Sequence, residues 1–300
     1  MKRQKYRLSS FNMRSLSLVC LFALSASVTA YDNIIAFADS FTDNGNDYKY
    51  SKFPPSPPYW RGRFSNGPTW LEEVAKQMPN TTVVNRGFGG ATTDDAYVHA
   101  TFNNFEVPGL LQQIANYPVP GNANSLFIIY IGYNDLNSII NPDQYIVTTP
   151  LTKDIVSDNV IKGIKNIEEK YHGKQFLVMT CPPFDKWPVV KDADKAKANE
   201  LITSYNQLLK SKLDKLTNVD IKMADTHTWF EQALANPGQF GLRTDNGPCV
   251  PGIGNTDECS DPDTHFFWDS YHPNAKVHKA EGEWATKLIE ELYPSKNHTT

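Results

Sequence analysis

The strongest indication of the fold comes from residues 33–46, which read Asn33-Ile-Ile-Ala-Phe37 and then Ala38-Asp39-Ser40-Phe41-Thr42-Asp43-Asn44-Gly45-Asn46. The first five residues form an apolar run with the length and composition of a buried strand, and the sequence then becomes abruptly small and polar. In open parallel sheets, ligands bind at the carboxyl ends of the strands. We therefore predict a β-strand at 33–37 and expect functional side chains directly behind it.

Short apolar runs similar to the first recur downstream, and longer amphipathic segments separate them. This alternation is typical of a mostly parallel sheet with helices on both faces. The predicted strands are Asn33–Phe37, Thr82–Asn85, Ser125–Ile131, Gln175–Cys181 and Asp220–Ala224. The predicted helices are Gly67–Gln77, Asp154–Tyr171, Asp192–Leu216, Trp229–Ala235 and Ala275–Leu292. No linker, repeat or change in composition interrupts residues 31–300, so we predict a single domain there.

Residues 1–30 have the pattern of a secretory signal peptide. Basic side chains open the chain, an apolar run follows from about Leu16 to Val28, and Val28-Thr29-Ala30 offers a small-residue cleavage site. Because the run is too short to span a bilayer comfortably, we expect a secreted protein without a stable membrane anchor. Cleavage removes five basic side chains and takes the formal net charge from −4 to about −9. With 40% hydrophobic and 21% charged residues, the chain is an ordinary acidic globular protein, and nothing favours a nucleic-acid partner.

The cysteines fit an oxidising compartment. Cys20 lies in the signal peptide and is absent from the expected mature chain. We expect a disulfide between Cys249 and Cys259, which would close a short loop rich in glycine, proline and aspartate. Cys181 ends an apolar run and is expected to be a buried free thiol. No Cys/His spacing suits zinc, so no metal site is predicted. The Asn-x-Thr sequons at Asn80 and Asn297 would accept glycans in a eukaryotic host.

Polar residues behind the predicted strands, and just before the last helix, supply the parts of an acyl-transfer site. Each is weak evidence alone, since a serine or an Asn-Asp pair behind a strand usually caps a helix or closes a turn. Together they complement one another: Ser40 is a nucleophile, His272 a base, and Asp269 a group that can orient the imidazole. The Ser40 and Gly90 amides and the Asn134 side chain could donate hydrogen bonds to a developing oxyanion.

Four short blocks, taken in order, resemble the GDSL, or SGNH-hydrolase, family. They are Ala38–Asn46 (similar to Gly-Asp-Ser-Leu followed by Ser/Thr-Asp-x-Gly-Asn), Asn85–Gly90 (the glycine block), Gly132–Asp135 (Gly-x-Asn-Asp) and Asp269–Pro273 (Asp-x-x-His-Pro). Residues 62–67 and 236–249 also resemble the eukaryotic and plant-like branch, which includes carbohydrate acetylesterases. The resemblance extends from about Ile34 to Leu292, which is nearly the whole chain after the leader.

This resemblance implies a flavodoxin-like, three-layer α/β/α sandwich around a mostly parallel five-stranded sheet. It implies a serine esterase that needs no cofactor, with the catalytic and oxyanion roles on the residues named above. Asp39 is expected to support the loop by hydrogen bonding. The chain departs from the family at Ala38, where the family has glycine, and at Phe41, where it has leucine. Ala38 tests whether the turn needs glycine for a positive φ or only for room, and we expect the change to be tolerated.

The substrate is less well determined, since the family includes lipases, phospholipases and carbohydrate acetylesterases. The proline-rich and aromatic segment Tyr48–Trp60 either rims the site or is a packed surface loop. A negative net charge disfavours tight binding to anionic lipid surfaces. We therefore expect the substrate to be a short-chain or carbohydrate-linked ester, with a longer-chain lipid ester as the alternative. We also expect the protein to be a monomer. Acyl transfer to an alcohol other than water, and a non-catalytic secreted binding protein that retains the fold, remain open.

Overall fold

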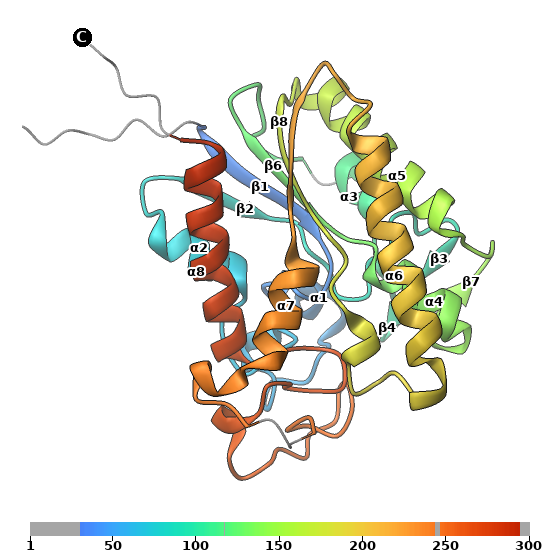
Figure 1. The fold of residues 1–300 in the computed structure, drawn as a ribbon, viewed down its shortest axis with the longest axis vertical. Helices are drawn as coiled ribbons and strands as arrows, with labels where there is room; N and C mark the ends of the chain where they lie inside the picture. The colour runs from blue at the N-terminus through green and yellow to red at the C-terminus, as the bar shows by residue number, and fades with distance from the viewer. Residues whose placement is uncertain (1–30, 117, 244–246, 295–300) are drawn as a thin grey trace, which may run out of the picture.

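The fold is built on a five-stranded parallel sheet (Figure 1). The computed structural model describes residues 31–116, 118–243 and 247–294. The strand order is β2-β1-β6-β8-β9, and every neighbouring pair is parallel. The strands are β1 (Asn33–Ala38), β2 (Thr82–Asn85), β6 (Leu126–Tyr130), β8 (Gln175–Met179) and β9 (Asp220–Ala224). All five predicted strands are present, with ends that differ by two residues at most.

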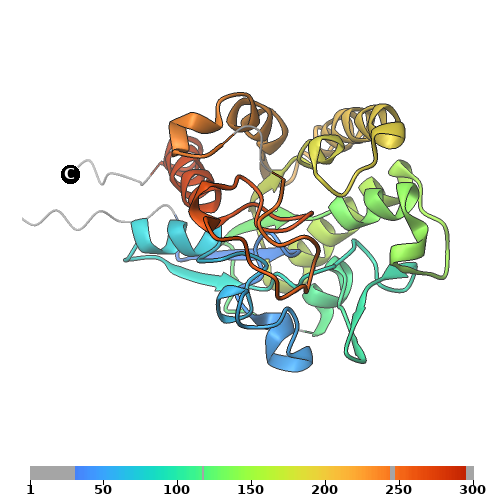
Figure 2. The same ribbon diagram turned by 90° about the horizontal axis from the view of Figure 1, so that it is seen from below.

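Helices cover both faces of this sheet (Figures 1 and 2). One face carries α2 (Trp70–Gln77), α7 (Thr226–Ala235) and α8 (Ala275–Leu292). The other carries α3 (Leu110–Asn116), α4 (Tyr133–Ile140), α5 (Lys153–Tyr171) and α6 (Asp192–Leu213). The predicted three-layer α/β/α architecture is thus confirmed. β1 and β6 are almost completely buried, as expected for strands covered on both sides.

Shorter elements surround the carboxyl end of the sheet. They are the helix α1 (Asn46–Ser51) and two antiparallel pairs, β3 (Val98–His99) with β7 (Ile146–Val147) and β4 (Thr101–Phe102) with β5 (Phe105–Glu106). The sequence pattern does not predict these elements, because two-residue strands carry no periodicity of their own.

Helix caps account for the two helix starts that differ by three residues from the prediction. α2 begins at Trp70 rather than Gly67, because the Glu72 carboxylate accepts the Thr69 N–H at 3.0 Å, as in a capping box. α7 begins three residues earlier than predicted, because the Asp225 side chain accepts the Thr228 N–H at 3.0 Å.

The sequence pattern also misses α3 and α4. With seven and eight residues, each is too short for a helical period to stand out. α4 begins directly behind β6, where a glycine–tyrosine–asparagine–aspartate sequence reads equally well as a turn. Gly132 makes the abrupt change from strand to helix feasible, since its φ of 117° lies in the left-handed region.

The register of the sheet gathers the segments that follow its first three strands. Ala36 in β1 lies opposite Asn85 at the end of β2, and Ala38 lies opposite Tyr130 at the end of β6. The chain segments that leave these strands therefore emerge side by side, at the same edge of the sheet. These segments contain the serine, glycine and asparagine singled out in the sequence.

Candidate active site

Ser40 and His272, 232 residues apart in the sequence, meet at the carboxyl end of the sheet. His272 Nε2 lies 2.8 Å from Ser40 Oγ, and His272 Nδ1 lies 2.8 Å from Asp269 Oδ1. A neutral imidazole that donates from Nδ1 to the carboxylate presents the Nε2 lone pair to the serine hydroxyl. This is the arrangement in which a histidine can remove the serine proton, so the structure brings together the three residues predicted to act in sequence.

Local structure fixes the loop that carries Asp269 and His272. Trp268 donates its N–H to the His272 carbonyl at 2.8 Å, and Asn274 caps α8 by accepting the Val277 N–H at 3.0 Å. The imidazole is flanked by the ring of Phe64 at 5.1 Å between centroids. The histidine is therefore held between a helix start and an aromatic wall.

Asp269 is fully buried and depends on hydrogen bonds to remain so. Its Oδ1 accepts the backbone N–H groups of Tyr271 (2.8 Å) and His272 (2.9 Å). Its Oδ2 accepts the hydroxyl of Tyr59 at 2.8 Å. Burial is the main cause that raises the pKa of the Tyr59 hydroxyl, and the nearby carboxylate adds to it, so this hydroxyl acts as a donor.

Tyr59 is a residue that the sequence does not single out. It lies in the proline-rich segment expected either to rim the site or to pack as a surface loop, and it is completely buried. Its oxygen accepts the Gly254 N–H at 2.9 Å, so one hydroxyl connects the Asp269 loop with the loop closed by the disulfide. No local pattern marks this tyrosine, since its partner Asp269 is 210 residues away.

The three predicted oxyanion donors face one cavity. It has a volume of about 290 Å³ and is lined by Ser40, Phe64, Gly90, Ala100, Phe102, Tyr133, Asn134, Gln144, Tyr145, Ile253, Tyr271 and His272. Gly90 has a φ of 75°, and a Cβ atom there would lie 2.7 Å from the Ala100 Cβ, so both conformation and space require glycine. Asn134 Nδ2 donates to the Ala91 carbonyl at 2.9 Å, which ties the asparagine to the glycine loop.

Two buried carboxyl groups shape the loop that holds the serine. Asp39 Oδ1, in the residue predicted to support the loop, accepts the Phe41 N–H at 3.1 Å. Burial raises the pKa of Asp39 to about 8. Asp43, for which the sequence predicts no role, accepts the Gly45 N–H at 2.7 Å and the Gly89 N–H at 3.0 Å. It thereby links the serine loop to the glycine loop.

Ala38 causes no backbone strain. It is the last residue of β1, pairs with Tyr130, and is not among the residues with positive φ. Gln113 holds it from both sides, accepting the Ala38 N–H at 3.2 Å and donating to the Ala38 carbonyl at 3.0 Å. The turn therefore does not need glycine for its torsion angles at this position.

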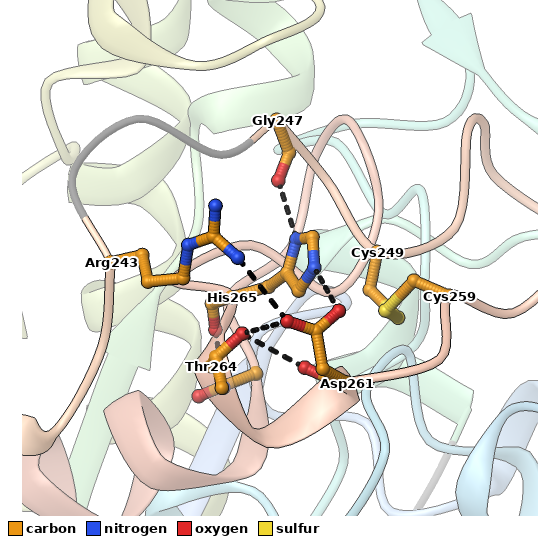
Figure 3. The surroundings of a disulfide bond; sticks show 8 residues. Arg243, Gly247, Cys249, Cys259, Asp261, Thr264 and His265 are labelled. Carbon is orange, nitrogen blue, oxygen red and sulfur yellow. Dashed lines mark hydrogen bonds and ion pairs between the residues drawn. A yellow bond between two sulfur atoms is a disulfide. The ribbon is translucent and has the colours of Figure 1, made fainter.

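The predicted disulfide between Cys249 and Cys259 is present, and Cys181 is a buried free cysteine. Figure 3 shows that His265 lies beside the disulfide, with its Nδ1 2.8 Å from the Gly247 carbonyl. The sulfur atoms and a histidine nitrogen lie within 4.8 Å of one another. Because both sulfurs are consumed by the disulfide, this group cannot offer thiolate ligands to a metal.

Two predictions concern the surface and the ends of the chain. Asn80 is exposed in the turn behind α2, where a glycan could be attached. The proposed signal peptide at 1–30 and the sequon at Asn297 lie outside the described residues. Within the ranges that the structure covers, no helix has the length and apolar character needed to cross a membrane.

Comparisons with known proteins bear on the activity of this site. The sequence profile of the family described as GDSL-like lipase/acylhydrolase matches residues 34–285. A phosphatidylcholine-sterol acyltransferase of Aeromonas hydrophila is 27% identical, over 92% of this chain and 97% of its own. An acetylesterase of Thermothelomyces thermophilus is 25% identical, over 82% of this chain and 84% of its own. The structure of Axe2, an acetylxylan esterase from Geobacillus stearothermophilus, shares the fold with a TM-score of 0.50 and 14% identity, covering 90% of this chain and 97% of its own.

The matched residues, 34–285, make up most of the chain. They include all four sequence blocks, Ser40, His272 and every residue that lines the cavity. The chain therefore belongs to the GDSL-like lipase/acylhydrolase family and is a carboxylic ester hydrolase.

Proposed function

We propose that the chain is a secreted serine esterase that hydrolyses carboxylic esters through an acyl-enzyme on Ser40. The observation that carries this proposal is the hydrogen-bonded series from Asp269 through His272 to Ser40, which ends in the cavity. The expected signal peptide at 1–30 supports secretion, and glycosylation at Asn80 and Asn297 would accompany it in a eukaryotic host.

In this mechanism Ser40 Oγ attacks the ester carbonyl while His272 Nε2 takes its proton. Asp269 holds the imidazole in the required tautomer and stabilises the imidazolium. The oxyanion accepts hydrogen bonds from the Ser40 and Gly90 amides and from Asn134 Nδ2. His272 then protonates the departing alcohol, and a water molecule, deprotonated by the same nitrogen, hydrolyses the acyl-enzyme.

The cavity favours an ester with a small acyl group. Its volume of about 290 Å³ is at the lower end of the range of small-molecule sites, about 300–1,000 Å³. Aromatic side chains such as Phe64, Phe102 and Tyr133 line it, and these suit either a sugar ring or a short alkyl chain. The similarity to an acetylesterase supports the same substrate class.

A lipid ester is the second candidate, because one exposed apolar side chain lines the cavity and others belong to segments that contribute lining residues. Large exposed hydrophobic residues in the described ranges are Tyr50, Ile146, Val147 and Ile253. Ile253 lines the cavity, and Ile146 and Val147 follow the lining residue Tyr145 in the sequence. Tyr50 stacks on Phe105, which belongs to the same β4–β5 hairpin as the lining residue Phe102. Such a rim would suit an amphiphilic substrate. The similarity to a phosphatidylcholine-sterol acyltransferase supports this candidate and also acyl transfer to an alcohol other than water.

The test is hydrolysis of p-nitrophenyl esters from acetate to palmitate by the wild type and Ser40→Ala. We expect a rate that peaks at acetate or butyrate and disappears in Ser40→Ala, with little change in melting temperature. A peak at long chains would favour the lipid candidate, and an acylated product after addition of a sugar or glycerol would reveal acyl transfer. A folded wild type that neither turns over esters nor reacts at Ser40 with a fluorophosphonate would favour a non-catalytic binding protein.

A further inference from the structure

We infer that Tyr145 is a positioning residue of the oxyanion hole, whose hydroxyl holds the Asn134 carboxamide with its nitrogen toward the reacting carbonyl. The inference rests on the proposed function, in which Asn134 stabilises the oxyanion. A carboxamide has two ends of nearly equal size, an NH₂ group that donates and an oxygen that accepts. Only the donor end can stabilise a negative oxygen, so the orientation of the side chain matters for the rate.

The hydrogen bonds of Asn134 define its orientation. Tyr145 donates its hydroxyl to Asn134 Oδ1 at 3.0 Å, and Asn134 Nδ2 donates to the Ala91 carbonyl at 2.9 Å. The bond to Ala91 uses one of the two hydrogens on Nδ2, and the other remains for a ligand in the cavity. Tyr145 and Asn134 both line the cavity that contains Ser40.

The direction of the Tyr145 hydrogen bond follows from its other neighbour. Asn137 Nδ2 donates to the Tyr145 oxygen at 3.0 Å, and Asn137 Oδ1 accepts Asn141 Nδ2 at 3.0 Å. Because Asn137 approaches with a donor, the single hydroxyl hydrogen of Tyr145 is directed to Asn134 Oδ1. Asn137 is completely buried, so its carboxamide has these side chains as partners in place of water. The series of donors is therefore oriented from Asn141 toward Asn134.

The segment that carries Tyr145 is anchored at both ends. On one side, β7 pairs with β3 through Val147 and Val98. On the other side, Gln144 Oε1 accepts the Tyr271 hydroxyl at 2.8 Å, and Tyr271 directly precedes the proposed base. Tyr145 is thus tied to the loop of His272 as well as to Asn134, which is what a group that fixes the geometry of a site requires.

The rate loss expected from removing the Tyr145 hydroxyl is smaller than the loss caused by removing an oxyanion donor altogether. Removing one oxyanion donor costs about 10²–10³ in rate. Tyr145→Phe keeps the Asn134 nitrogen but allows the carboxamide to rotate, so we expect a smaller loss, roughly tenfold in kcat with KM changed less than about twofold.

The experiment measures p-nitrophenyl acetate hydrolysis by the wild type, Tyr145→Phe, Asn134→Ala and the double variant, together with inhibition by an alkylboronic acid. We expect Tyr145→Phe to lower kcat and weaken boronate binding by similar factors, with an unchanged melting temperature. The double variant should be no slower than Asn134→Ala, because Tyr145 acts only through Asn134. Tyr97→Phe removes a hydroxyl from the segment next to β3 and serves as the matched control, with wild-type kinetics expected.

Two results would overturn the inference. One is wild-type kcat in Tyr145→Phe while Asn134→Ala is slow. The other is an equal loss from Tyr145→Phe in both backgrounds, which would mean that the tyrosine touches the substrate directly. A wild-type rate in Asn134→Ala is a different outcome, because it would remove the oxyanion role itself from the proposed function.

Discussion

At the scale of single residues, Tyr59 shows how a distant side chain supports a buried charge. Asp269 is completely enclosed, and its Oδ2 accepts only the Tyr59 hydroxyl besides the imidazole nitrogen among the described contacts. If a buried carboxylate loses a hydrogen-bond donor, its desolvation free energy is no longer offset, because water cannot reach it to replace the donor. Tyr59 also accepts the Gly254 N–H, so it joins the proposed orienting acid to the disulfide loop.

We therefore predict that Tyr59→Phe lowers both stability and activity. Loss of a hydrogen bond to a charged group costs about 1.5–3 kcal/mol in unfolding free energy. We expect kcat/KM to fall roughly tenfold, since one tenfold step corresponds to about 1.4 kcal/mol of transition-state stabilisation. Urea unfolding and ester hydrolysis measure the two effects, with Tyr48→Phe as control.

Asp269→Asn should be far slower than Tyr59→Phe, and a wild-type rate in Asp269→Asn would mean that another group orients His272.

At the scale of elements, the packing of α2 against α8 depends on a helical glycine. A Cβ atom on Gly282 of α8 would lie 2.6 Å from Glu73 Cβ and 2.7 Å from the Trp70 carbonyl oxygen. The backbone of α2 cannot yield as a flexible side chain would. Since α8 starts directly behind His272, its contact with α2 also holds the proposed base in place.

Gly282→Ala is accordingly expected to destabilise the protein, although alanine is the better helix former by about 1 kcal/mol. Overpacking of this kind costs about 1–3 kcal/mol, so the net effect should be a lower melting temperature. Gly163→Ala in α5 is the matched control, because its nearest neighbour is the end of the Leu110 side chain, which can move. Equal effects of the two substitutions in thermal unfolding would contradict the packing argument.

At the scale of the whole molecule, buried carboxyl groups make stability depend on pH. Burial raises the pKa of Asp39 to about 8, and it also raises the pKa of Asp43, Asp47, Asp135 and Glu281. As pH rises above about 4, the unfolded chain releases these protons, while the folded protein retains each one until the pH approaches the raised pKa of that group, which is about 6 for Asp43 and Asp135 and about 8 for Asp39. Each such group then lowers the free energy of unfolding by at most about 1.4 kcal/mol per pH unit.

Buried His278 acts in the opposite direction, since burial lowers its pKa to about 3 and the unfolded chain alone gains a proton below the ordinary histidine pKa. Its Nδ1 lies 3.6 Å from Glu281 Oε2. Among the described residues, the carboxyl groups whose pKa is raised by burial outnumber this histidine. We therefore expect the melting temperature to be higher near pH 5 than near pH 8.

Glu281→Gln isolates one member of this group. Glu281 is completely buried, and glutamine keeps the shape of the side chain but cannot ionise. The difference in melting temperature between pH 5 and pH 8 should therefore be smaller in Glu281→Gln than in the wild type. Glu283→Gln changes an exposed glutamate on the same helix and should leave the difference unchanged. An unaltered pH profile in Glu281→Gln would exclude this residue as a source of the pH dependence.

The sequence by itself determined the parallel sheet, because strands such as β1 and β6 are continuous apolar runs whose pattern is local. It also determined Ser40, Asp269 and His272 as candidates, because each stands beside a strand end or a helix start that local signals mark. The tertiary structure alone decided that Tyr59 supports Asp269 and that Tyr145 orients Asn134. The hydrogen bond between Tyr59 and Asp269 joins segments 210 residues apart, and the cavity is formed by side chains from many loops. Such contacts depend on how the elements pack, and no local sequence pattern encodes that packing.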